Sequence, residues 1–130
     1  MNRYEDWLKQ ADNDLAWARH SFAGGFYAQT CFIAQQAAEK ALKAWCFFKG
    51  FDIVRTHSIF QIVRALGEDG VLEKCARELD IYYVSARYPD ALPAGAPFEI
   101  LTREQAQGAI GSAETIFALV RARLAESDRP

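Results

Sequence analysis

The stretch A-Q-T-C-F-I-A-Q-Q-A-A-E-K-A-L-K-A-W, from Ala28 to Trp45, decides the fold of this chain. Its apolar residues recur at three- and four-residue steps, which is the spacing of a helix face. One stripe consists of Ala28, Phe32, Leu42 and the next residue after the stretch, Cys46. It is widened by Ala34, Ala38, Ala41 and Trp45. A helix that is apolar around so much of its circumference lies at the centre of a bundle. The sequence therefore predicts a central helix over about 26–49, ended by Gly50.

Helical patterns flank this central helix on both sides. Apolar residues at helical spacing mark four further segments, at about 2–22, 58–66, 71–87 and 102–124. Ser58 and Thr102 each stand three residues before a glutamine, the spacing of a capping box. Pro89 disfavours helical geometry at the residue before it, and 89–97 reads as an extended, proline-stiffened loop. No segment alternates with period two, so we predict an all-α fold, an up-and-down bundle of four main helices plus one short helix.

The composition indicates one globular domain. The chain has 130 residues, of which 51% are hydrophobic and 25% charged, and its net charge is −2. It therefore lacks the overall basic charge that is typical of nucleic-acid-binding domains. We expect a single helical domain over 1–126 and a polar tail over 127–130.

The spacing of the cysteines and histidines argues against disulfides and metal sites. Cys31, Cys46 and Cys75 form no C-x-x-C pair, and His20 and His57 stand far apart in the sequence. This usage predicts reduced thiols in a cytoplasmic protein, with no metal site and no cofactor. The most apolar run, 44–48, is too short to span a bilayer, and the charged start lacks the apolar middle of a signal peptide.

The central helix carries an unusual number of polar groups. Lys40 and Lys43 share one face, and Gln35 and Glu39 fall beside the apolar stripe. In one interpretation Gln35 and Glu39 point into a cleft, Glu39 orients the site and the lysines attract a phosphate-bearing ligand. In the other, Glu39 pairs with Lys43 on an ordinary solvated surface.

Two further places could hold an anion. His57 precedes a predicted helix start, where it could complete a phosphate site or simply bond to local backbone. Arg87 stands beside Asp90 in A-R-Y-P-D, where it could bind a phosphate or pair with a carboxylate of its own chain. Either Asp14 or Glu39 could be the carboxylate that reaches it in a bundle.

Several motifs together resemble the HEPN (higher eukaryotes and prokaryotes nucleotide-binding) domain family. They are A-D-N-D-L-A-W-A at 11–18, G-F-Y-A-Q-T-C-F-I-A-Q-Q-A-A-E-K-A-L-K-A at 25–44, H-S-I at 57–59 and A-R-Y-P-D at 86–90. The resemblance implies a helical bundle that forms a homodimer and is often paired with a minimal nucleotidyltransferase, as in toxin–antitoxin systems. Some members are metal-independent ribonucleases, with an arginine followed after four to six residues by a histidine. Neither Arg87 nor the two histidines have a partner at that spacing.

The sequence thus supports three hypotheses. The first is a non-catalytic HEPN-type module that binds a nucleotide or other phosphate ligand, or pairs with a nucleotidyltransferase, through Lys40, Lys43, His57, Arg87 and Asp90, with Glu39 and Asp14 as orienting carboxylates. The second is a ribonuclease that uses Arg87 and His57 in a non-standard arrangement. The third is a dimerisation domain whose polar groups are internal ties.

Overall fold

The computed structural model describes residues 3–52 and 54–126, and these residues form helices, turns and loops without a strand. The predicted tail at 127–130 lies outside the described residues. The elements are α1 (Tyr4–Ala23), α2 (Tyr27–Phe48), α3 (Ile59–Ala65), α4 (Val71–Asp80), α5 (Tyr82–Ser85), the 3₁₀ helix η1 (Pro89–Ala91), α6 (Pro97–Ile100) and α7 (Arg103–Glu126). The all-α prediction is confirmed.

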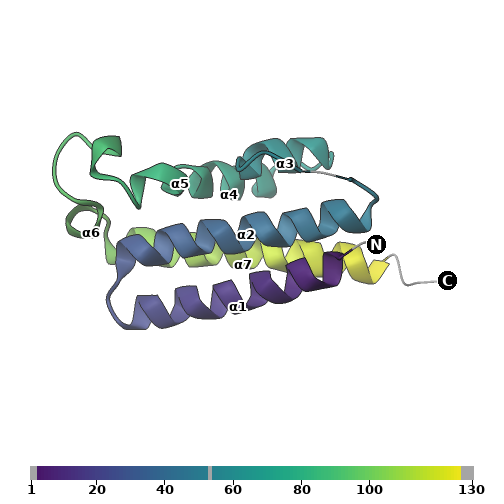
Figure 1. Cartoon of the computed structure of the whole chain (residues 1–130), viewed down its shortest axis with the longest axis horizontal. Coiled ribbons are helices and arrows are strands. Elements are labelled where there is room, and N and C mark those ends of the chain that lie inside the picture. Colours follow the sequence, from purple (N-terminus) through teal and green to yellow (C-terminus); the bar gives the residue numbers. More distant parts are fainter. Residues whose placement is uncertain (1–2, 53, 127–130) are drawn as a thin grey trace.

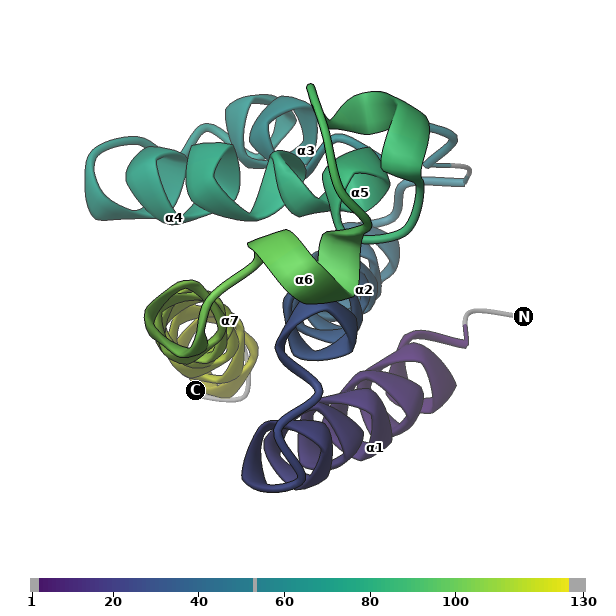
Figure 2. The ribbon, with the colours of Figure 1, turned by 90° about the vertical axis from the view of Figure 1, so that its left-hand side faces the viewer.

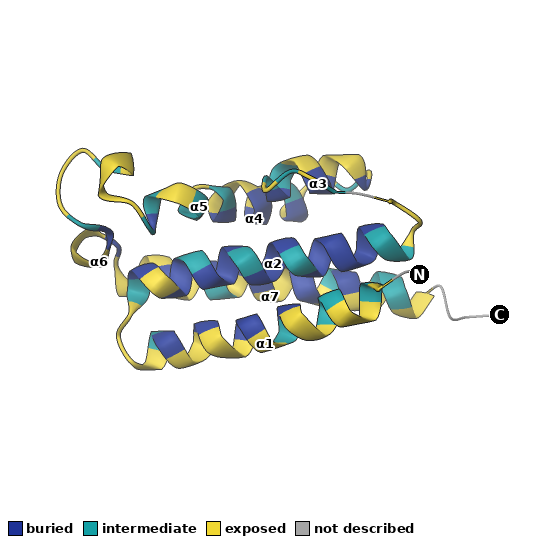
Figure 3. Ribbon diagram, in the orientation of Figure 1, coloured by how far each residue is buried: buried dark blue, intermediate teal, exposed yellow. Residues whose placement is uncertain are grey.

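Helix α2 is the centre of the molecule, as its sequence predicts. Viewed along the bundle in Figure 2, it lies between α1, α7 and the layer of α3, α4 and α5. Its surface is buried along most of its length, whereas α1 keeps an exposed outer face (Figure 3). Its many alanines, among them Ala34, Ala38 and Ala41 at 0% exposure, let neighbouring helices approach closely on several sides.

The three long helices run up and down. In Figure 1 the chain passes along α1, returns along α2 and finally runs along α7, so that the start of α1 and the end of α7 lie at the same end. Helices α1 and α7 both pack on α2 and also touch each other. The shorter helices α3 and α4 cover the remaining side of α2, and α4 also contacts α7. Within 3–52 and 54–126 no helix is both long and apolar enough to cross a membrane.

The helix predicted over 71–87 is split, which corrects the sequence interpretation. Helix α4 ends at Asp80, and a separate single turn, α5, follows Ile81. Ile81 is 65% exposed, so packing does not hold the helix together there. The Ser85 hydroxyl also donates to the Ile81 carbonyl, competing with the backbone ladder. Tyr88 is extended (φ −121°, ψ 125°), as the following proline demands.

The loop at 89–97 is less extended than predicted. Pro89 begins η1 and Pro97 begins α6. Proline is favoured at the first position of a helix because its φ is already helical and its missing N–H would have no partner there. The two prolines therefore start short helices, and the chain between them is irregular.

Candidate functional site

Glu39 and Lys43 form a buried ion pair on α2. Lys43 Nζ lies 3.0 Å from Glu39 Oε2, and the side chains are only 7% and 6% exposed. Gln35, fully buried one turn earlier, donates from Nε2 to Glu39 Oε1 at 3.3 Å. The predicted pairing one turn apart is confirmed, but the solvated surface expected with it is wrong. A buried carboxylate needs such partners, because leaving one unpaired in the core costs several kcal/mol.

His57 joins this pair from the segment before α3. Its Nδ1 lies 3.2 Å from Glu39 Oε2, and its carbonyl accepts a hydrogen bond from Gln35 Nε2 at 3.3 Å. An ionised carboxylate can only accept, so Nδ1 carries the proton and donates to Glu39. The His57 side chain is 56% exposed. A buried carboxylate therefore orients an imidazole that is accessible to a ligand.

Asp80, at the end of α4, fixes the chain next to His57. Its Oδ1 accepts from the Ile59 N–H at 2.7 Å, and its Oδ2 accepts from the Phe60 N–H at 3.0 Å and the Ser58 hydroxyl at 2.9 Å. The predicted cap by Ser58 is also present, since its Oγ accepts from the Gln61 N–H at 3.2 Å. A carboxylate from another helix thus supplements the local cap and holds the start of α3 in place.

Arg87 lies against aromatic rings and does not pair with a carboxylate. Its guanidinium carbon is 4.4 Å from the centre of the Phe32 ring and 4.8 Å from the centres of the Tyr83 and Tyr88 rings. Its Nε donates to the Tyr83 carbonyl at 2.9 Å. Among the described residues it has no ion pair, so the expectation that Asp14 or Glu39 would reach it is wrong. Both carboxylates already hold a lysine.

Tyr83 links the arginine to the histidine. The His57 ring stacks on the Tyr83 ring at 5.0 Å with an angle of 15° between the planes. The Arg87 guanidinium approaches the same tyrosine ring. The structure therefore brings together Glu39, Lys43 and His57 by direct contact, and adds Arg87 through Tyr83. We refer to these five residues as the His57–Arg87 cluster.

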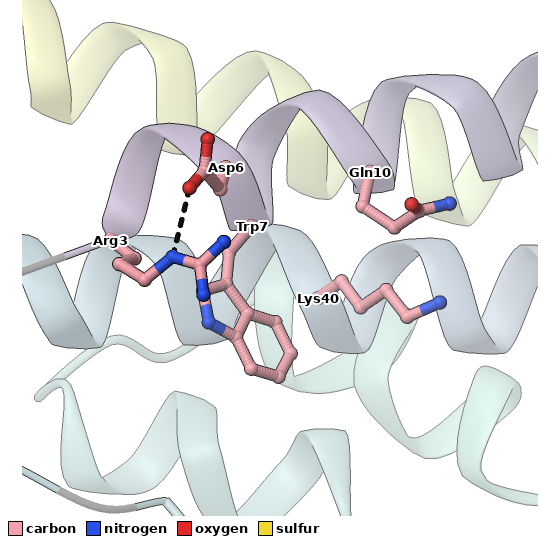
Figure 4. Close-up of a pocket in the computed structure, with 5 residues that line it drawn as sticks. All are labelled: Arg3, Asp6, Trp7, Gln10 and Lys40. Atoms are coloured by element: carbon pink, nitrogen blue, oxygen red, sulfur yellow. Dashed lines mark hydrogen bonds and ion pairs between the residues drawn. The ribbon is translucent and has the colours of Figure 1, made fainter.

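The remaining predicted site residues lie apart from the His57–Arg87 cluster. Lys40 Nζ pairs with Asp14 Oδ2 on α1 at 2.5 Å, and Gln10 donates to Asp14 Oδ1 at 3.0 Å. Lys40 and Gln10 extend side by side in Figure 4. Asp90 is exposed on η1 and forms no ion pair with any described residue. The structure thus separates the predicted set into two groups and leaves Asp90 in neither.

Sequence reasoning missed Tyr83 and Asp80. Tyr83 shares helical spacing with core residues, so nothing in the pattern marks it as the ring between His57 and Arg87. Asp80 caps a helix 20 residues earlier in the chain, a contact that no local capping signal contains. Over 3–52 and 54–126, no three His, Cys, Asp or Glu side chains gather in a way that could hold a metal ion.

The buried polar atoms of the His57–Arg87 cluster all have hydrogen-bond partners, whereas its exposed groups still have atoms free to bind a ligand. No buried side-chain nitrogen or oxygen of the described residues lacks a hydrogen-bond partner. The ligand-accessible groups are the His57 ring and the half-buried Arg87 guanidinium. An imidazole and a guanidinium beside one tyrosine can bind a phosphate, and an imidazole oriented by a carboxylate can also transfer a proton.

The fold and this site define a class: all-helical bundle domains in which the central helix carries a buried ion pair facing an exposed histidine. The chain belongs to the HEPN domain family, whose model matches residues 4–123. The resemblance seen in its sequence motifs is thereby confirmed.

Relatives of known structure agree with this assignment. The fold is similar to that of TT1696 from Thermus thermophilus (TM-score 0.88, 43% identity, 94% of this chain and 98% of that one). It is also similar to ST0689, an archaeal HEPN homologue (TM-score 0.83, 40% identity, 95% and 98% covered). Among curated proteins, the chain is 26% identical over 132 residues to "Putative toxin MJ1304" of Methanocaldococcus jannaschii, covering 92% of this chain and 86% of that protein.

Proposed function

We propose that this protein is a HEPN-type binding module that takes a phosphate-bearing ligand, such as a nucleotide, at Arg87 and His57. In this role Glu39 and Lys43 orient His57 from within the core and do not touch the ligand. Lys40, predicted as a ligand-binding residue, is held by Asp14 and contributes no direct contact at this site.

The main support for this proposal comes from the contacts of the Arg87 guanidinium. Charged side chains are almost never fully buried unless they are paired. Arg87 is half-buried, and its partners are three aromatic rings and one carbonyl. Its Nε is used by the Tyr83 carbonyl, and its terminal nitrogens have no described protein partner. A guanidinium that is stacked on rings and free at its outer nitrogens is suited to bidentate binding of a phosphate.

The protein is further proposed to act with protein partners, as one half of a toxin–antitoxin-like pair. The similarity to a protein named as a toxin supports this, as does membership of the HEPN family. A homodimer paired with a minimal nucleotidyltransferase is the arrangement that the family resemblance implies. Light scattering on the purified chain tests the homodimer, and co-purification with a co-expressed minimal nucleotidyltransferase tests the pairing.

Calorimetry tests the ligand. Titration with adenosine, guanosine, uridine and cytidine phosphates should give heat with at least one of them, and Arg87→Gln and His57→Gln should weaken that binding. Loss of one charged contact should cost roughly tenfold or more in Kd. Arg64→Gln is the matched control, because Arg64 also lies over an aromatic ring, that of Phe60 at 5.7 Å, and is exposed. Equal affinities for the Arg87 and Arg64 variants would disprove the proposed site.

A second function is favoured by one observation, the contact between Glu39 and His57. A carboxylate that fixes the histidine tautomer is what a general base requires. In an RNA-cleaving reaction, His57 would take the proton of a 2′-hydroxyl as its oxygen attacks the adjacent phosphorus. The 5′-oxygen would leave with a proton taken from solvent, the proton on His57 would later return to solvent, and Arg87 would stabilise the charge on the phosphate.

RNA cleavage assays separate the two functions. If the protein is a ribonuclease, wild-type chain should cleave single-stranded RNA, and both His57→Gln and Arg87→Gln should abolish cleavage. Intact RNA after long incubation, together with nucleotide binding that depends on Arg87, would leave only the binding function.

A further inference from the structure

One side chain touches both groups of the proposed ligand site. The Tyr83 ring stacks on the His57 ring at 5.0 Å, with 15° between the planes, and its centre lies 4.8 Å from the guanidinium carbon of Arg87. The Tyr83 carbonyl also accepts the hydrogen bond from Arg87 Nε at 2.9 Å. Of the three described rings that lie against Arg87, only that of Tyr83 also stacks on His57.

The end of α4 brings Tyr83 to the histidine. Tyr83 lies in α5, three residues after Asp80, the last residue of α4. Ile81 between them keeps helical backbone angles (φ −56°, ψ −35°), and residues three apart lie on the same side of a helical segment. Asp80 holds the backbone that follows His57, through two N–H groups at the start of α3. The same side of this segment therefore meets both the backbone after His57 and its ring.

The two contacts of the His57 side chain have different effects. The Glu39 carboxylate, 3.2 Å from Nδ1, determines which ring nitrogen carries the proton. A single hydrogen bond leaves the ring free to turn about it, and the side chain is 56% exposed, so little else restrains it. The stack on Tyr83 supplies the missing restraint, because offset stacking fixes the plane of one ring relative to the other.

The Arg87 guanidinium is restrained by the same tyrosine. Its Nε is held by the Tyr83 carbonyl, and its planar group lies over the Tyr83 ring. A long side chain such as arginine has many rotamers, and a ligand that binds it must order them at a cost in affinity. Contacts that order the guanidinium beforehand reduce this cost.

We infer that Tyr83 is a positioning residue, which holds the His57 ring and the Arg87 guanidinium in a fixed relation to each other before a phosphate binds. The inference rests on the proposed function and assigns Tyr83 no contact with the ligand. Its consequence is that the two binding groups act together, since both are already ordered when the phosphate arrives.

Nuclear magnetic resonance on the free protein tests what Tyr83 holds. The chain has two histidines, so His20→Gln assigns their ring signals. In Tyr83→Leu, the order parameters of the His57 ring C–H groups should fall towards those of His20, which is exposed on α1. Tyr83→Phe should keep the wild-type values, because the contacts with His57 and Arg87 use the ring and the carbonyl and not the hydroxyl. Unchanged order parameters in Tyr83→Leu would overturn the inference.

Titrations with inorganic phosphate and adenosine monophosphate test the consequence. Tyr83→Leu should weaken binding roughly tenfold, because the ligand must then order two side chains, and Tyr83→Phe should bind as the wild type does. Tyr88→Leu is the matched control, since the Tyr88 ring lies at the same 4.8 Å from Arg87 but does not stack on His57, and it should weaken binding less. Thermal denaturation checks that all three variants are folded.

Failure of the proposed function would give a different result. If the wild-type protein binds neither ligand, the phosphate site is disproved, and the order parameters of the free protein still decide whether Tyr83 positions His57. If the wild type binds and Tyr83→Leu binds equally tightly, the phosphate site stands and the inference is overturned. In the Tyr83→Leu background, His57→Gln should also cost less affinity than it does in the wild type, because the histidine is no longer held in place.

Discussion

The Glu39 carboxylate lies 3.2 Å from the ring nitrogen of His57, although the two residues belong to α2 and to the segment before α3. Glu39 is buried and His57 is more than half exposed. The contact therefore connects the core of the bundle to its surface. A ligand at His57 therefore meets an imidazole whose orientation is set by a buried ion pair. A substitution that disrupts this pair should also disturb the position of His57.

Glu39→Gln should strongly destabilise the protein. The substitution leaves the Lys43 ammonium, only 7% exposed, without its counter-charge, so we expect the free energy of unfolding to fall by roughly 3–5 kcal/mol in urea denaturation. The double variant Glu39→Leu with Lys43→Met removes both charges and should lose less than the single variant does. A double variant that loses as much as Glu39→Gln or more would contradict this expectation.

Asp80→Asn should loosen the start of α3 and disturb His57. Asp80 accepts three hydrogen bonds from Ser58, Ile59 and Phe60, and replacing a charged acceptor should cost about 2 kcal/mol. The His57 ring signals in an NMR spectrum should shift as well. Asp90→Asn is the control: Asp90 is exposed and has no ion pair with a described residue, so its loss should not measurably change stability.

Arg87→Gln should be mild for stability. Because the guanidinium contacts rings and not a carboxylate, we expect a loss of only about 1 kcal/mol. The free energies of unfolding of Arg87→Gln and Glu39→Gln can be compared by thermal or urea denaturation. A loss as large as that of Glu39→Gln would instead indicate that Arg87 is an internal tie, as in the hypothesis of a purely structural dimerisation domain.

Alkaline pH should destabilise the fold through its buried thiols. Burial raises the pKa of Cys31 to about 12, and burial, partly offset by Lys49 and Lys43, raises the pKa of Cys46 to about 11. In the unfolded chain both thiols ionise near their ordinary pKa of about 8.5. Their contribution to stability is therefore complete below about pH 8.5 and is lost as the pH rises towards the folded pKa values.

The slope of stability against pH measures this effect. Each thiol can add up to about 1.4 kcal/mol of lost stability per pH unit above that point. Urea denaturation between about pH 8 and pH 10.5 should show the decline, and Cys31→Ala should make it shallower whatever its effect on stability at neutral pH. An unchanged slope in Cys31→Ala would show that Cys31 ionises as readily in the folded protein as in the unfolded chain.

The sequence by itself determined the helices and the place of the most apolar one. Residues 26–49 repeat apolar side chains around most of a helix, and α2 is the buried centre for that reason. Local chemistry also set the capping box at Thr102, where the Gln105 N–H donates to the threonine oxygen at 3.1 Å, and the extended geometry at Tyr88 before Pro89. These features depend on neighbours within a few residues, so the chain shows them directly.

Only the tertiary structure decided which charges meet. Spacing along α2 paired Glu39 with Lys43, but the helices that cover α2 buried the pair and brought His57 to it. By sequence alone Asp14 could have reached Arg87, but the packing of α1 on α2 pairs it with Lys40. Arg87 was left with aromatic rings. Side chains on different helices meet according to how those helices are rotated and inclined, and these angles are set by packing of the whole core.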